Sequence, residues 1–209
     1  MRQIGLFILL AFITLSCAEK PKNKYDDLYV VLDELLRFKY YDDVVILELN
    51  KVQKYSVDMI NFKDDTIKDR PLPPPPPGLI HYDREFLDGL CEDKLIDSVD
   101  IDYMLNQIDS LKDFTLDSSK IEKKSLRYSV LTPFFKKYSI DSAYSIIRQK
   151  FGAQSFIRIS TPLFSKKGNK MLMDIDVYCG GLCGGGMTYL FEKRNGKWRI
   201  TYSRSNWIS

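Results

Sequence analysis

Two cysteines and five glycines near the C-terminus form the densest chemical signal in this sequence. Residues 179–186 read Cys-Gly-Gly-Leu-Cys-Gly-Gly-Gly, so three residues separate Cys179 from Cys183. Cysteines on either side of a tight turn can reach the Cα separation of about 5.5 Å that a disulfide requires. We therefore favour a structural disulfide, and a labile pair acting as a thiol switch is the alternative. The run Gly184 to Gly186 is expected to supply positive φ angles or to let another backbone approach closely.

Metal and phosphate chemistry fit this motif less well. A zinc site needs four ligands, or three and a water, and only Cys91 and His81 remain to complete one. Cys91 falls on the apolar face of an expected helix, which predicts that it is buried. A phosphate-binding glycine loop is followed by a helix, whereas an alternating, strand-like segment follows these glycines. We expect no metal and no cofactor.

Few side chains are suited to catalysis. His81 is the only histidine, and nothing near it in the sequence would orient it as a base. Asp174 and Asp176 would share one face of a strand about 7 Å apart, a spacing that could serve a pair of carboxylates or a cation. We expect His81 to be an ordinary surface or packing residue and the two aspartates to lie on a solvated face. No catalytic residue is assigned, and an enzyme using either His81 or the Asp174/Asp176 pair remains the alternative.

The N-terminus has the pattern of an export signal. Arg2 precedes an apolar stretch over residues 4–15 that is too short to span a bilayer. Ser16 and Cys17 resemble the end of a bacterial lipoprotein signal, although Thr14 stands where leucine is usual. The resemblance implies a signal peptide at 1–16, an acylated Cys17 carrying chains such as palmitate, and a tether at 17–24. Cleavage after Ala18 without acylation is the alternative.

Composition limits the partners of the folded part. The 209 residues include 31 basic and 28 acidic side chains, a balance that does not favour nucleic acid. The pairs Lys123-Lys124, Lys136-Lys137 and Lys166-Lys167 are scattered along the chain, and we interpret them as solvated surface. Residues 25–209 are predicted to form one domain. Its proline-rich segment at 71–77 is predicted to be a stiff surface connection.

Hydrophobic periodicity predicts an α+β fold. Helical spacing occurs at 25–38, 83–95, 100–111 and 141–151, the last ending at Gly152. Short apolar or β-branched runs predict strands at 44–49 and 125–135, and more weakly at 54–62. From residue 155 the period becomes two, which predicts a C-terminal four-stranded antiparallel meander with a hairpin turn at Asn195-Gly196. Trp198, Ile200 and Tyr202 are expected to share one apolar face.

The ending of the chain resembles known exported proteins. The Cys-Gly motif, the strand after it and Asn195-Gly-Lys-Trp198 resemble the C-terminus of uncharacterised small lipoproteins of Bacteroidetes-type bacteria. This hairpin is also similar to those of cystatin-like and nuclear-transport-factor-like α+β folds. The resemblance implies a β-meander and no particular activity. We expect a lipid-anchored protein of the cell envelope, on the outer membrane and facing the periplasm or the cell surface, that binds a ligand or an envelope protein.

Overall fold

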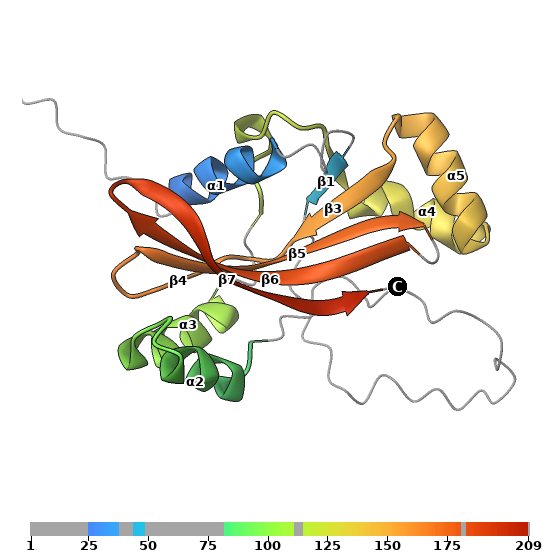
Figure 1. Cartoon of the computed structure of the whole chain (residues 1–209). Helices are drawn as coiled ribbons and strands as arrows, with labels where there is room; N and C mark the ends of the chain where they lie inside the picture. Colours follow the sequence, from blue (N-terminus) through green and yellow to red (C-terminus); the bar gives the residue numbers. More distant parts are fainter. Residues whose placement is uncertain (1–24, 38–43, 49–81, 111–114, 181–182, 209) are drawn as a thin grey trace, which may run out of the picture.

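A curved sheet organises the molecule (Figure 1). The computed structural model describes residues 25–37, 44–48, 82–110, 115–180 and 183–208. The strands are β1 (Val44–Glu48), β2 (Ser125–Arg127), β3 (Ser155–Ile159), β4 (Leu163–Phe164), β5 (Lys170–Gly180), β6 (Cys183–Arg194) and β7 (Lys197–Ile208). They form one seven-stranded sheet in the order β2-β1-β3-β5-β6-β7, with β4 paired to β5. Cys17, the strand predicted at 54–62, the proline-rich segment and His81 lie outside the described residues.

The predicted C-terminal meander is confirmed. Strands β3, β5, β6 and β7 pair antiparallel in sequence order, and Asn195 and Gly196 form the last turn with φ of 50° and 76°. Both central positions of a type I′ turn require positive φ, which explains the Asn-Gly pair. The sequence did not predict how β1 would pair, and the structure places it parallel to both β2 and β3.

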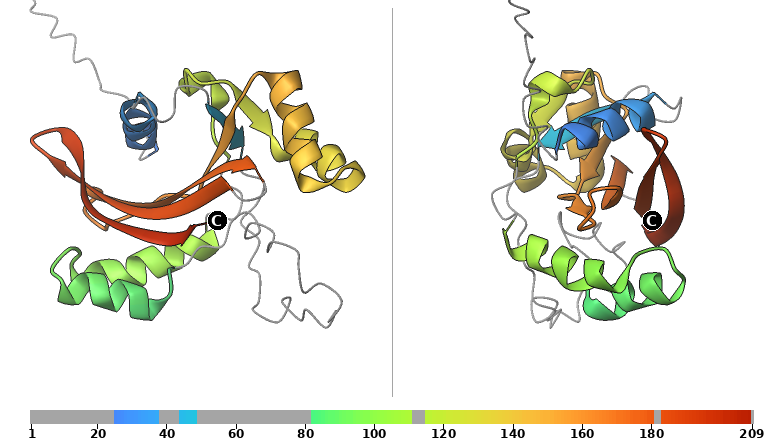
Figure 2. Two further views of the ribbon diagram at one scale, coloured as in Figure 1. Left: turned by 45° about the vertical axis from the view of Figure 1, so that its right-hand side comes forward. Right: turned by 90° about the vertical axis from the view of Figure 1, so that its left-hand side faces the viewer.

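One face of the sheet is covered by helix α1 (Asp26–Leu36), as Figure 2 shows. Alternate residues of β5 point to this helix, because successive side chains of a strand face opposite ways. They include Met171, Met173 and Ile175, which are buried with Leu28 and Leu32 of α1. The helix predicted at 25–38 is thus confirmed, and its leucines form the main core with the meander.

The opposite face is covered at one end by helices α2 (Arg84–Glu92) and α3 (Ser98–Ser110). Asp83 caps α2 by accepting a hydrogen bond from the backbone N–H of Phe86 at 2.9 Å. Leu172 and Leu190 of the sheet pack beneath this helical pair. Both predicted helices are confirmed, but Cys91 is only partly buried against this cluster, because it lies toward the edge of the apolar face of α2.

Helices α4 (Tyr128–Lys137) and α5 (Ile140–Phe151) pack at the end of the sheet near β1 and β3 (Figure 1). Gly152 ends α5 in the left-handed conformation with φ of 70°, as predicted. The strand predicted at 125–135 is wrong beyond Arg127, because the chain turns into α4 and carries Pro133 inside that helix. Leu131 of α4 is 1% exposed, so packing outweighs the strand propensity of its β-branched and aromatic residues.

Two irregularities in β7 change which side chains share a face. The register shifts so that Leu190 pairs with Tyr202 and Phe191 with Ile200, which leaves Thr201 as an extra residue. Trp198 therefore packs on the α1 side, whereas Tyr202 packs beside Phe86 under α2. The expectation that Trp198, Ile200 and Tyr202 share one face is wrong for this reason. Among the described helices, none has both the length and the apolar character needed to cross a bilayer.

Candidate functional site

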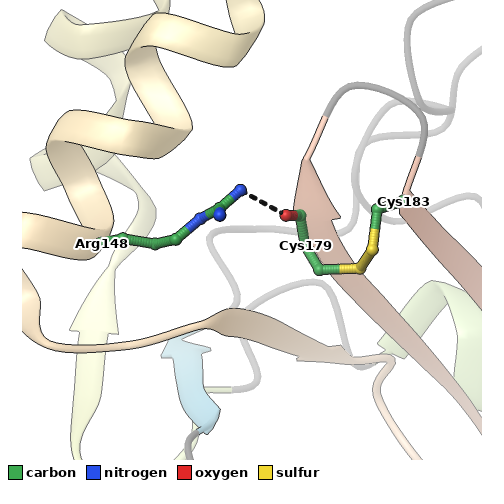
Figure 3. Close-up of a disulfide and its surroundings, with 3 residues drawn as sticks. All are labelled: Arg148, Cys179 and Cys183. Atoms are coloured by element: carbon green, nitrogen blue, oxygen red, sulfur yellow. Dashed lines mark hydrogen bonds between the residues drawn. A yellow bond between two sulfur atoms is a disulfide. The ribbon is translucent and has the colours of Figure 1, made fainter.

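The two cysteines of the opening motif form a disulfide across the β5–β6 hairpin (Figure 3). The Cα atoms of Cys179 and Cys183 are 5.0 Å apart, which confirms the predicted pair. Arg148 of α5 reaches the same hairpin, and its guanidinium donates a hydrogen bond to the carbonyl oxygen of Cys179 at 2.8 Å. The disulfide closes the end of the hairpin, and Arg148 joins that end to α5.

The glycines after Cys183 make room for an aromatic side chain. Gly186 of β6 pairs with Asp176 on one side and with Trp207 on the other. A Cβ atom at Gly186 would overlap both Asp176 Oδ1 and Trp207 Nε1, and one at Gly184 would lie 2.9 Å from the indole ring. A Cβ atom at Gly184 would also lie 2.8 Å from the backbone oxygen of Val177, so the expected close approach of another backbone is confirmed there. The expected positive φ angles are not found at Gly184 to Gly186.

A polar strip, defined as Ser160, Asp174, Thr188 and Asn206, crosses the sheet face opposite α1. Asp174 is 4% exposed, so the expected solvated face is wrong at this residue. The hydroxyl of Thr188 lies 2.5 Å from Asp174 Oδ1, and Asn206 donates to the same oxygen at 3.3 Å. Ser160 accepts a hydrogen bond from the backbone N–H of Asp174 at 2.9 Å. Oδ1 of Asp174 thus exchanges contacts with water for contacts with protein groups.

Tyr82 lies beside this strip, immediately before α2. Burial, and after it the charge of Asp174, raises the pKa of the Tyr82 hydroxyl well above its usual range. The phenol therefore stays protonated and neutral next to the carboxylate, where it can donate a hydrogen bond. No sequence pattern pointed to Tyr82 or Thr188, because each joins the strip only through pairing and packing of distant segments.

Asp176 lies two residues along β5 and is more open than Asp174. Trp207 donates to its Oδ1 at 2.9 Å, and Arg158 lies directly opposite it on β3. Arg158 is buried, donates to the hydroxyl of Tyr178 at 3.0 Å and stacks on that ring. Each aspartate is thus held by neighbouring strands, an arrangement suited to fixing the sheet. An enzyme using the two aspartates stays a prediction.

A cavity opens on the other side of the sheet, between α1 and the β6–β7 hairpin. Its volume is about 220 Å³. Its walls are mostly apolar and are formed by Val31, Glu34, Leu35, Phe191, Trp198, Arg199 and Ile200. Trp198 is 4% exposed, and its indole N–H has no hydrogen-bond partner within the described part of the chain. The sequence showed the apolar residues but not the space between them.

Metal ligands are not grouped in the parts of the chain that the structure describes: no three His, Cys, Asp or Glu residues lie close enough to hold an ion. No protein family, curated protein or solved structure matches this chain.

Proposed function

We propose that this protein is an exported, lipid-anchored component of the cell envelope whose folded domain binds a ligand or partner. Residues 2–17 support the anchor, because a basic residue, a short apolar stretch and Ser16-Cys17 follow each other in the order of a lipoprotein signal. The acylated Cys17 would hold the domain at the outer membrane, on its periplasmic or surface side. Two or more acyl chains give stable anchoring, whereas one does not.

The cavity beside α1 is the observation that carries the binding role. Ligand sites are concave and mostly apolar, with a few polar groups that fix orientation. At about 220 Å³ the cavity exceeds the engineered cavity of about 150 Å³ that admits benzene. It can take one aromatic ring or a short apolar chain. The buried N–H of Trp198 could donate to an acceptor on such a group, which would compensate its loss of water.

The test is a titration with anilinonaphthalene sulfonate, a fluorescent probe with an apolar ring system. Ile200 lines the cavity and is 46% exposed, so Ile200→Trp should fill the opening without disturbing the core. Ile208 is 85% exposed and does not line it, which makes Ile208→Trp a matched control. We expect saturable binding that Ile200→Trp abolishes and Ile208→Trp preserves. Equal binding by both variants would show that the probe does not bind in this cavity, and the cavity would then not support a binding role.

A further inference from the structure

Charge is segregated between two pairs of helices. Residues 83–110, which include α2 and α3, hold nine acidic and two basic side chains. Residues 121–151, which include α4 and α5, hold seven basic and two acidic ones. The near balance of the whole chain hides this separation, because the acidic excess of the first segment is largely offset by the basic excess of the second. The lysine pairs at 123–124 and 136–137, interpreted from sequence as scattered, belong to one basic segment.

The two helical pairs lie on opposite sides of the molecule. Figures 1 and 2 show α2 and α3 below one end of the sheet, with α4 and α5 above its other end. Helix α1, the first described element, lies on the same upper side in all three views. The proposed tether precedes α1 in the sequence. The lipid anchor is therefore expected on the side of the basic helices and not on the side of the acidic ones.

The basic surface, defined as Lys124, Lys136, Lys137 and Lys150, is exposed. Within the described ranges, none of these four lysines pairs with a carboxylate, whereas Lys120, Lys167 and Lys193 elsewhere do. Three of the four lie over aromatic rings instead, such as Lys137 over Tyr138 at 5.1 Å and Lys150 over Phe134 at 5.2 Å. Their charge is thus available to an anionic partner.

Apolar side chains are exposed among these lysines. Val130 is 41% exposed, Tyr138 37% and Ile140 36%, and all three lie on α4, on α5 or between them. Helices that lie on a membrane surface combine basic side chains with apolar side chains that enter the headgroup region. A purely electrostatic contact with a soluble acidic protein would not need these apolar groups.

We propose that the basic surface rests on anionic phospholipid headgroups of the membrane that carries the anchor. This orientation rests on the proposed lipid anchor at Cys17. Each Lys or Arg near an anionic membrane surface adds to the attraction. The acidic α2–α3 pair then faces away from the membrane, and on the near side Asp26 and Asp27 of α1 are paired with Lys120 and Lys193. The acyl chains hold the domain at the membrane, and the basic surface sets the orientation of the domain relative to the membrane.

The acidic helices of a second copy are the competing partner. Contact between the basic side of one molecule and the acidic side of the next would be head-to-tail, and such contacts build open chains unless the rotation closes. The exposed apolar residues and the position of α1 favour the membrane. Salt-sensitive self-association is therefore an outcome that the experiment must detect.

The experiment uses the mature chain from residue 17 with Cys17→Ser, so that no acyl chain contributes. The described residues of the three core clusters lie at Tyr25 or beyond, so this chain keeps all of them. Binding is measured by co-sedimentation with phosphatidylcholine vesicles, with and without phosphatidylglycerol. We expect binding only with phosphatidylglycerol, and weaker binding as salt is added.

Lys136→Gln with Lys137→Gln should lower the partition coefficient about 30-fold, from about 1 kcal/mol for each lysine. The control removes two exposed lysines elsewhere, through Lys166→Gln with Lys197→Gln, and should leave binding nearly unchanged. No binding to anionic vesicles, or equal loss in both variants, would overturn the proposal. Self-association without vesicles that the first variant abolishes would assign the basic surface to a second copy. Because this protein is unacylated, the result does not depend on whether Cys17 is lipidated.

Discussion

The indole of Trp207 reaches across a neighbouring strand to donate a hydrogen bond to Asp176 at 2.9 Å. Gly186 lies between the two residues in the sheet register, and its missing side chain leaves the space that the ring occupies. The register shift beside Gly186 turns Trp207 to the face of Asp176. An aromatic ring covering a glycine on an adjacent strand is a known stabilising device in sheets.

Gly186→Ala should destabilise the fold by about 1–3 kcal/mol, because the added Cβ would displace either Trp207 or Asp176. The matched control is Gly185→Ala, whose Cβ would meet its nearest neighbours at 3.5 Å. That change should be neutral or slightly stabilising, since alanine restricts the unfolded chain more than glycine does. Urea unfolding midpoints measure both variants. Similar midpoints would mean that Trp207 does not fill this space.

Thr188→Val should cost about 1.5–3 kcal/mol, the usual range for a hydrogen bond to a charged group. The hydroxyl of Thr188 lies 2.5 Å from Asp174 Oδ1, and both residues are buried. Thr188→Ser keeps the hydroxyl and should cost less, although it loses a buried methyl group. Denaturant unfolding at neutral pH compares the two. If the valine variant is as stable as the serine variant, the polar strip does not hold the sheet face.

Stability should fall in alkaline solution partly through Tyr82. Its pKa is raised in the folded state by burial and by Asp174, whereas the unfolded tyrosine ionises near its ordinary value of about 10. The stabilising contribution is complete below that ordinary value and is lost as pH rises toward the folded pKa. Tyr82→Phe should therefore flatten the alkaline loss. Tyr103→Phe, at an exposed position of α3, should leave it unchanged, and thermal melts across this pH range provide the measurement.

The disulfide should contribute about 2 kcal/mol, the chain-entropy value for so short a loop. Cys179→Ser with Cys183→Ser should lower the unfolding free energy by this amount without changing the fold. Alkylation and mass spectrometry in mild reductant separate a structural bond from a thiol switch. A structural bond stays oxidised, whereas rapid and reversible labelling of both cysteines would favour the switch.

The sequence predicted the elements whose pattern depends on one segment alone. Helices α1, α2, α3 and α5 follow from leucine and isoleucine spacing, and the last hairpin follows from Asn195-Gly196. Helix α4 was missed because residues such as Val130 and Phe135 favour a strand locally, and only packing against the rest of the molecule makes them helical.

Fewer features of the candidate site could be predicted from the sequence. The disulfide could be predicted from spacing, but the reason for Gly186 depends on Trp207, which lies 21 positions along the chain and is placed by a register shift. Asp174 was expected to face solvent because alternation cannot show whether helices cover both faces of a sheet. The separation of charge depends on how the helical pairs are arranged in space.

Mass spectrometry of the mature N-terminus tests the central claim most directly. For protein isolated from envelope membranes, we predict a chain that begins at Cys17, with a mass increased by a diacylglyceryl group on the sulfur. An unmodified N-terminus at Glu19, which would follow from cleavage after Ala18, would contradict the lipid anchor.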